Sequence, residues 1–305
     1  MSTVSDPVNF SAPSGVDAGL TPKQLVAKYG LTVSGKRPGL LRYVRELWSR
    51  RQFIMAFATA RLVAQYTTAK LGQVWQVLTP LLNCAVFYLV FGVMMKSGES
   101  IDPYIPWLCI GVFVFQFSQS AVLSGTRAIS DNLGLIRALH FPRASLPIAF
   151  TVIQLQQLLI SMIVLVGIVL FWQPPAMTWL LLIPALALQC VFNTGLALIF
   201  ARIGAKTSDM AQLMPFLLRT WMYTSGVMYS VQGAVEKWPT IWQALFRLNP
   251  ASVYMDLIRY AFIPNTYNKE ALPPHVWAIA GGWALVAGLV GFVYFWKAEE
   301  QYGRG

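Results

Sequence analysis

The side chains of this sequence that could carry chemistry are few and far apart. Its two histidines, His140 and His275, lie far apart in the sequence, and each is expected to be a polar surface residue rather than an acid–base group. Cys84, Cys109 and Cys190 fall one per apolar segment, without the spacing of a metal site or a disulfide, and are expected to pack as small apolar residues. The sequence therefore predicts no catalytic site, no metal site and no cofactor bound by this chain.

A nucleotide site is not encoded either. A phosphate-binding loop needs the pattern G-x-x-x-x-G-K-[ST], in which backbone amides and the lysine hold the phosphates. Gly35 and Lys36 are followed by Arg37 and have no matching upstream glycine. Any ATP hydrolysis linked to this chain must come from a partner.

The composition predicts an all-α integral membrane protein. Of 305 residues, 56% are hydrophobic and 11% are charged, whereas soluble domains carry about 25% charged residues. A helix needs roughly 20 apolar residues to cross the hydrocarbon core, and the uncharged windows predict six such helices. We expect them at about residues 74–95, 104–124, 145–172, 177–202, 210–231 and 276–296.

The net charge of +11 follows the predicted topology, and no nucleic-acid partner is expected. Ten of the 23 lysines and arginines lie in residues 1–77. Six crossings put that region on the same side as segments 126–144 and 202–209 and the C-terminal tail, which are basic too. Because basic residues stay in the cytoplasm, both termini are expected inside a plasma membrane, with contact to anionic lipids as a second role.

The segments outside the spans have their own patterns. Residues 1–39 are expected to be a disordered cytoplasmic leader, because they are polar and lack the apolar core of a secretory signal. Residues 40–73 alternate basic and apolar faces at helical spacing, which predicts an amphipathic helix on the membrane surface. The six-span domain then occupies residues 74–305.

The longest outer connection is residues 232–275, which is too apolar for a solvated loop. It predicts two short helices that break at Asn249–Pro250 and dip into the membrane as a re-entrant pair. Asn249 or Ser252 can cap the second helix. Asp256 and Arg259 lie three residues apart on it and are expected to form a local ion pair.

Polar residues inside the spans leave two interpretations open. In the third and fourth spans they either bond neighbouring helices or line a polar path; these residues are Gln154, Gln156, Gln157, Gln189, Asn193 and Thr194. Arg219 in the fifth span is costly in hydrocarbon and so a functional candidate, or its side chain snorkels to the inner interface.

The segment SDNLGLIRALHFPRASLP (130–147) joins the second and third spans on the cytoplasmic side. Asp131 can cap a short helix in it, and Phe141 and Pro142 end that helix. Four apolar residues, Leu133, Leu135, Ile136 and Leu139, are offset from Arg137. A short, rigid, partly apolar cytoplasmic helix predicts docking into a groove on a soluble partner.

Three stretches of the chain share their motifs with one family. In the first stretch, ARLVAQYTTAKLGQVWQVLTP (60–80), the matching residues are Arg61, Tyr66, Leu71, Gly72, Trp75 and Pro80. In the second, NLGLIRALHFPRASLP (132–147), they are Asn132, Leu135, Ile136, Phe141, Pro142, Arg143, Leu146 and Pro147. In the third, RLNPASVYMDLIR (247–259), they are Asn249, Pro250 and Arg259. Over roughly residues 40–300 the sequence resembles the membrane subunits of ATP-binding-cassette exporters of polysaccharides and polyol phosphates. Ala60 and the TTA at 67–69 depart from the family pattern.

The resemblance implies a permease subunit that pairs with a second copy of itself and with two cytoplasmic ATPase subunits, which bind ATP and Mg²⁺. ATP-driven closure of the ATPases would bias the spans between gated states. The implied ATPase-docking residues are Asp131, Asn132, Leu135, Ile136, Arg137, Phe141, Pro142 and Arg143. The implied substrate is a polyprenyl-diphosphate-linked cell-envelope polymer, such as O-antigen, teichoic acid or galactan.

Such a substrate needs cations for its diphosphate and aromatic faces for its sugar rings. The residues expected at the cytoplasmic entrance are Arg51, Arg61, Tyr66 and Lys70, although the cations also fit the inside-positive topology. The residues expected to line the channel are Phe87, Tyr88, Phe91, Arg219, Trp221, Tyr223 and Tyr229. A drug exporter or a secondary carrier remains an alternative. Paired acids for a transferase are missing from the sequence, as are acids within the spans for a proton-driven carrier.

Overall fold

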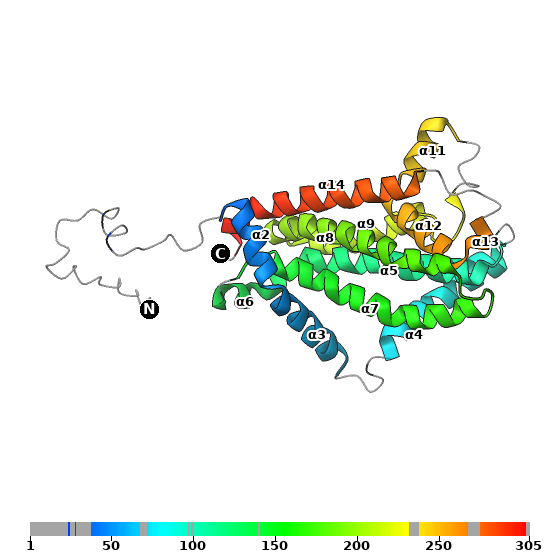
Figure 1. The fold of residues 1–305 in the computed structure, drawn as a ribbon, viewed down its shortest axis with the longest axis horizontal. Helices are drawn as coiled ribbons and strands as arrows, with labels where there is room; N and C mark the ends of the chain where they lie inside the picture. The colour runs from blue at the N-terminus through cyan, green and yellow to red at the C-terminus, as the bar shows by residue number, and fades with distance from the viewer. Residues whose placement is uncertain are drawn as a thin grey trace, which may run out of the picture. The chain divides into compact units, whose positions relative to one another are not determined.

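The computed structural model is helical throughout the part of the chain that it describes (Figure 1). The described residues are 24, 28, 38–67, 72, 74–96, 98, 101–139, 141–231, 238–267 and 275–302. The chain divides into two units, residues 1–37 and 38–305, and the helices below belong to the second. No strand occurs among the described residues.

The second unit contains helices of very different length. The long ones are α3 (Arg51–Thr67), α4 (Val74–Phe87) with its π-helical extension η1 (Tyr88–Met94), α5 (Tyr104–Arg127), α7 (Ser145–Leu170), α8 (Leu182–Lys206), α9 (Asp209–Thr224) and α14 (Val276–Trp296). The short ones are α2 (Leu40–Ser49), η2 (Ser130–Asn132), α6 (Leu133–Ala138), η3 (Met177–Leu181), α11 (Thr240–Arg247), α12 (Pro250–Phe262), α13 (Pro264–Tyr267) and η4 (Glu299–Gln301).

Five of these segments are long and apolar enough to cross a membrane: 74–94, 104–127, 145–170, 177–206 and 276–296. They coincide with five of the six predicted spans. The segment predicted as the fifth span, 210–231, differs, because α9 has 16 residues and ends at Thr224. Ser225 and Gly226 follow in a turn, and Gly226 has a φ of +67° that an L side chain rarely adopts.

Helix α5 is the central element of the bundle. It packs against α4 and α7 as well as against α8, α9 and α12, and most of its side chains are buried. Helices α8 and α14 form the most extensive helix pair and lie side by side in Figure 1. The buried core of the bundle therefore lies around α5 and is closed by α12, which is also almost entirely buried.

The first and last described residues of this unit meet at one end of the bundle, which we call the tail end. It comprises α2, residues 128–144 and residues 297–302, and it has a buried cluster of its own. Trp296 donates its indole N–H to the carbonyl of Pro38 at 3.0 Å. The rings of Phe295 and Tyr302 stack at 4.6 Å. The opposite, far end carries α11, α12 and α13.

Two local expectations change and one is confirmed. The single surface helix expected over 40–73 is two helices, α2 and α3, which meet at Arg50. Asp131 does not cap α6, because the N-cap position belongs to Asn132 and the Asp131 carboxylate instead accepts from the Ser130 hydroxyl at 3.3 Å. Asn249 caps α12 as predicted, since its side-chain oxygen accepts from the Ala251 amide at 3.2 Å.

Helices α8 and α14 approach each other closely at Gly195 and Gly291, and this close approach predicts the effect of a substitution on stability. A Cβ atom on Gly195 would lie 2.2 Å from the Ala287 carbonyl oxygen. Gly195→Ala is therefore expected to lower the free energy of unfolding by about 1–3 kcal/mol, the usual cost of overpacking. Thermal unfolding of the purified protein in detergent measures this. Gly282→Ala on α14, where a Cβ has open space, is the control, and equal midpoints for both variants would refute the close approach.

Candidate functional site

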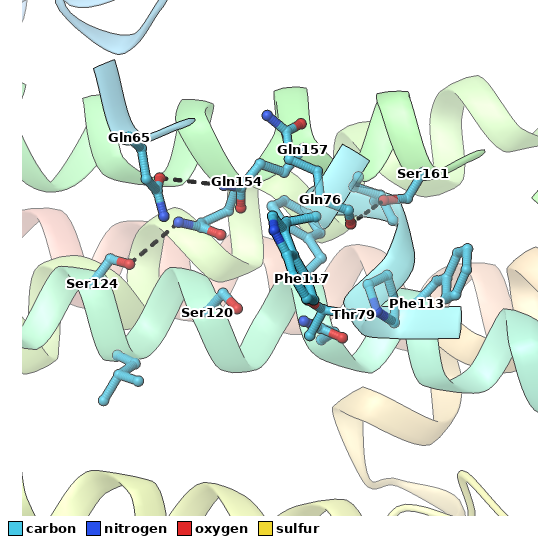
Figure 2. Close-up of a pocket in the computed structure, with 15 residues that line it drawn as sticks. Gln65, Gln76, Thr79, Phe113, Phe117, Ser120, Ser124, Gln154, Gln157 and Ser161 are labelled. Carbon is cyan, nitrogen blue, oxygen red and sulfur yellow. Dashed lines mark hydrogen bonds between the residues drawn. The ribbon is translucent and has the colours of Figure 1, made fainter. Parts of the chain in front are cut away.

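A cavity of about 310 Å³ opens between α4, α5, α7 and the end of α3 (Figure 2). Its walls combine amides, hydroxyls and aromatic rings. The lining residues are Gln65, Trp75, Gln76, Thr79, Pro80, Phe113, Gln116, Phe117, Ser120, Leu123, Ser124, Gln154, Gln157, Leu158 and Ser161. No charged side chain is among them.

The helical repeat explains why these polar residues face one space. On α5, Gln116, Ser120 and Ser124 follow each other at intervals of four, which places them on one face of the helix. On α7 the polar lining residues recur at intervals of three and four, and on α4 two of them lie three apart. Each helix therefore presents a polar stripe to the cavity rather than to lipid.

The stripes are joined by hydrogen bonds between helices, drawn in Figure 2. Gln154 donates from Nε2 to the Ser124 hydroxyl at 3.3 Å. Gln157 donates to Oε1 of Gln65 at 3.4 Å. These bonds tie α7 to α5 on one side and to α3 on the other.

Gln76 differs from the other lining glutamines. Its residue is 6% exposed, and neither its Nε2 nor its Oε1 has a hydrogen-bond partner among the residues that the structure describes. Pro80 has no N–H to donate to the Gln76 carbonyl, and the Ser161 hydroxyl donates there at 3.3 Å instead. The backbone of Gln76 is thus satisfied by α7, while its side-chain amide is held at the cavity wall without a partner.

A second cavity of about 400 Å³ adjoins the first toward the tail end of the bundle. It is lined by Arg61, Ala64, Gln65, Ser124, Phe150, Ile153 and Gln154, of which Gln65, Ser124 and Gln154 also line the first cavity. We call the two together the polar groove. Arg61 is the one charged residue in its described walls, so the groove combines a cation at one end with neutral hydrogen-bonding groups along its length.

The chemistry of the polar groove favours binding over catalysis. Amides and hydroxyls can donate to and accept from the hydroxyls of a neutral ligand, and Trp75, Phe113 and Phe117 offer apolar ring faces. None of the described lining residues is a carboxylate, histidine or cysteine that could move a proton or act as a nucleophile. The described residues also contain no group of three or more potential metal ligands.

The four residues predicted at the entrance are placed unequally. Arg61 lines the polar groove. Arg51 lies at the start of α3, where its guanidinium is over the Trp48 ring at 5.6 Å, outside the groove. Tyr66 belongs to α3 by its backbone, its side chain lies outside the described residues, and so does all of Lys70.

The residues predicted to line a channel fall into two groups on different helices. Phe87, Tyr88 and Phe91 lie on α4 and η1, where Phe87 and Phe91 contact each other at 6.4 Å. The others lie on α9 and just after it. Arg219 and Tyr223 are exposed, the Trp221 indole donates to the Asn249 side chain at 3.0 Å, and the Tyr229 hydroxyl donates to the Tyr223 carbonyl at 2.8 Å. None of the seven lines the polar groove.

The predicted docking residues separate into an outward and an inward set. Asp131 and Arg137 are exposed. Leu135, Phe141 and Arg143 are partly buried, whereas Asn132, Ile136 and Pro142 are buried. Asn132 donates to the Ala128 carbonyl at 2.9 Å, and Ile136 packs in the tail-end cluster. The inward residues thus fix α6 on the bundle, and the outward ones remain accessible to a partner.

Sequence reasoning missed a cluster that holds this segment, which we call the hub: Tyr43, Arg143 and Glu299. The Glu299 carboxylate accepts from the Tyr43 hydroxyl at 2.8 Å and from the Arg143 backbone amide at 2.9 Å. The Arg143 guanidinium donates to the Glu299 carbonyl, and the Ala144 amide donates to the Tyr43 hydroxyl at 3.1 Å. Burial raises the pKa values of Glu299 and Tyr43. The hub joins three segments that are far apart in sequence, so no local pattern indicates it.

Arg259 at the far end is buried, with 2% of its residue exposed. The predicted ion pair with Asp256 is present at 3.5 Å. However, the guanidinium also lies over the Trp107 ring at 3.4 Å and donates to the carbonyls of Gly226 and Val227 at 3.3 and 3.2 Å. Arg259 therefore holds α12, α5 and the turn after α9 together.

Comparisons with known proteins identify the family of this chain. Residues 52–263 match the family model described as ABC-2 type transporter. The chain is 30% identical over 193 residues to the O-antigen export system permease protein RfbA of Myxococcus xanthus, covering 62% of this chain and 73% of that protein. A protein of the same name from Klebsiella pneumoniae is 23% identical over 80% of this chain and 90% of its own length.

A third relative is named for the transport of a different polymer, polysialic acid. The polysialic acid transport protein KpsM of Escherichia coli is 22% identical over 76% of this chain and 87% of that protein. The family model covers more than half of the sequence, including α3 to α12 and thus every helix that lines the polar groove. The chain belongs to the ABC-2 type transporter family.

Proposed function

We propose that this chain is the permease subunit of an ATP-driven exporter that moves a polyprenyl-diphosphate-linked cell-envelope polysaccharide across the plasma membrane. The observation that carries the proposal is the match to the ABC-2 family together with relatives named for the export of polysaccharides. The polar groove supports it, because a path for a hydroxyl-rich polymer needs neutral hydrogen-bonding walls.

In this proposal two copies of the chain pair with two cytoplasmic ATPase subunits, which bind ATP and Mg²⁺. The partner is needed because the sequence has no phosphate-binding loop. The outward residues of the 130–143 segment form the docking surface. Because the inward residues attach this segment to α2 and to the C-terminal residues, movement of the ATPase would be transmitted to the bundle as a rigid body.

The proposed topology has six crossings with both ends of the described unit in the cytoplasm. Residues 38–43 and 296–299 lie together at the tail end, which requires an even number of crossings. Helix α9 supplies the sixth, because its start lies beside the end of α5, where Arg127 donates to the Ala211 carbonyl at 3.5 Å. Its end meets α12, through the bond from Ser252 to the Ser225 carbonyl at 2.8 Å. The α11–α12 pair is then the re-entrant segment.

The proposal is tested by deleting the gene from the organism that encodes it. Surface polysaccharide is expected to fall, and its lipid-linked precursor is expected to accumulate on the cytoplasmic face of the membrane. The purified complex with the ATPase is expected to hydrolyse ATP faster when lipid-linked glycan is added. Normal surface polysaccharide, with increased sensitivity to hydrophobic drugs instead, would favour the drug-exporter alternative.

A further inference from the structure

We infer that the polar groove recognises the sugar attached to the lipid diphosphate, with Gln76 as the residue that selects for a sugar and Arg61 as the contact of the diphosphate. The inference rests on the proposed function and adds the part of the substrate that this site reads. It starts from the side-chain amide of Gln76, which is buried at the groove wall and lacks a partner.

A partnerless buried amide needs an explanation. Burial of an amide without a hydrogen bond is unfavourable, and native proteins satisfy most such groups. An apolar residue at this position would avoid that penalty, and Leu158 and Phe113 of the same cavity wall show that apolar side chains are accommodated there. A ligand that hydrogen-bonds both the N–H and the carbonyl oxygen of the amide supplies the missing partners, and sugar hydroxyls donate and accept at once.

The surroundings of Gln76 fit a single sugar ring. Gln116, Ser120 and Gln157 line the same cavity and add further neutral donors and acceptors, while Trp75 provides an apolar ring face. The volume of about 310 Å³ lies at the lower end of the range of small-ligand pockets, roughly 300–1,000 Å³. The cavity is thus sized for one small polar group rather than for a folded polymer.

The position of Arg61 orients this ligand. Gln154 lines both cavities, and Ser161, beside Gln76, lies seven residues further along α7, or about 10 Å at the helical rise. An anion at Arg61 therefore lies near the tail end, and a sugar joined to it reaches into the middle of the bundle. No described residue of either cavity wall is acidic, so the path does not repel a diphosphate.

The groove also lies against the side of the bundle where α3 meets α7, and pairs such as Gln156 with Thr59 hold these two helices together at 3.2 Å. A polyprenyl chain can stay in lipid while its head group enters between helices. The ligand class is therefore a glycosyl diphosphate on a lipid, in contrast to a free nucleotide sugar or an ordinary phospholipid.

The experiment measures ATPase activity and ligand binding of the full permease–ATPase complex in lipid nanodiscs. Two probes are compared: a polyprenyl diphosphate that bears one N-acetylhexosamine, and the same polyprenyl diphosphate without a sugar. The wild-type complex is expected to bind the sugar-bearing probe about tenfold more tightly, the effect of one or two hydrogen bonds to a buried polar group. A phospholipid carrying a phosphate head group is expected not to compete.

The variants separate the two contacts. Gln76→Leu is expected to lose the preference for the sugar-bearing probe while its thermal unfolding midpoint stays the same or rises, because the unpartnered amide is gone. Arg61→Gln is expected to weaken the binding of both probes equally. Gln156→Leu on α7 makes the same change outside the groove, beside Thr59, and is expected to keep the preference.

The outcomes distinguish this inference from the proposed function. If the wild-type complex binds both probes equally, or if Gln76→Leu keeps its preference, the groove does not read the sugar and the inference is wrong. If neither probe binds nor stimulates ATP hydrolysis, the exporter assignment itself fails. Competition by phospholipid would show that the groove is a general lipid head-group site and would also overturn the inference.

Discussion

Replacing Leu133 and Leu139 together with aspartate is expected to abolish co-purification of the permease with its ATPase subunit, and with it all ATP-driven export. Both side chains flank the exposed surface of α6 and its C-terminal end, with 36% and 50% of each residue accessible. In the proposed topology this end faces the cytoplasm, where exposed leucines on a short helix have little reason to face water but can fill a groove on a soluble partner. Two buried carboxylates in that groove would be unpaired and strongly unfavourable.

The choice of these residues follows from the packing of the segment. Arg143 and Leu135 are the more obvious targets by sequence, but Arg143 bonds to Glu299 and Leu135 packs in the tail-end cluster. Changing them would disturb the bundle, and a loss of association would then have two explanations. Leu133 and Leu139 are exposed and are not part of that cluster, so changing them tests the docking surface alone.

The measurement is a pull-down of the ATPase with tagged permease, followed by ATP turnover in nanodiscs. The control replaces Leu133 and Leu139 together with methionine, which keeps both exposed side chains apolar, and it is expected to leave the complex intact. Unfolding midpoints should match the wild type for all variants. If the double variant still binds the ATPase, α6 is not the docking element and the coupling route proposed above is wrong.

The spans and the outer helices could be predicted because hydrophobicity and breaking residues are local signals. The Asn249–Pro250 break and the 13-residue helix after it appear as predicted. The prediction of one continuous helix over 210–231 was wrong at its C-terminal end, because α9 ends at Thr224. The apolar run continues to Val231, but Gly226 adopts a left-handed conformation and Arg259 binds the carbonyls of the turn. That interaction comes from 33 residues away and has no local signature.

The sequence shows that the third and fourth predicted spans carry polar residues, but it does not decide whether each one bonds a neighbouring helix or lines a polar path. Some of these residues only bond neighbouring helices, whereas others also line the groove. Gln189 donates to the Val114 carbonyl and to Ser118 at 3.0 and 3.1 Å, which is a helix–helix bond. Gln154 and Gln157 line the polar groove and also bond Ser124 and Gln65 on neighbouring helices. The sequence cannot tell which polar residues line the groove, because the groove forms only where the polar faces of several helices meet. The positions of α3 and α4 beside α7 determine where that is.

The aromatic residues expected along a channel could not be assigned a role from the sequence. Aromatic side chains suit both a sugar path and ordinary packing, so residue type alone does not choose. Trp221 donates to Asn249 and contacts Phe115 at 5.4 Å. Tyr223 and Arg219 are exposed on α9, on a surface that a second copy of the chain would be free to cover. Their role as channel lining stays a prediction, which rests on the proposed pairing of two copies of the chain.

Glu299→Ala is expected to lower the free energy of unfolding by about 3 kcal/mol, because removal of one partner from a buried charged network typically costs 3–5 kcal/mol. Glu299 is 7% exposed and accepts from the Tyr43 hydroxyl and the Arg143 amide. Without it, these two donors stay buried and unpaired. Since the hub attaches the docking segment to α2 and to the end of α14, ATP hydrolysis should continue while the polymer exported per ATP falls.

The control is Glu299→Gln, which has the same shape and can still accept from Arg143, and pH provides a separate readout. Burial raises the pKa of Glu299 above its ordinary 4.5; the groups that face it are Tyr43 and Glu46 of α2, Arg143 and Tyr302. A raised pKa means that the folded protein binds the proton more tightly than the unfolded chain. The stabilisation is therefore complete below pH 4.5 and is lost as the pH rises through the folded pKa.

Wild-type protein should consequently show a fall in unfolding midpoint over the pH range just above 4.5, and Glu299→Gln should lack that fall. The ionised carboxylate is retained despite this loss of stability, although glutamine would keep much of the geometry. A buried anion that accepts two hydrogen bonds fixes one arrangement of α2, the docking segment and the tail, because any other arrangement would leave the charge unpaired. If Glu299→Gln exports as much polymer per ATP as the wild type, the hydrogen-bond geometry of the hub is sufficient to couple ATP hydrolysis to export. If its efficiency falls to that of Glu299→Ala, the charge is what makes the three segments move as one.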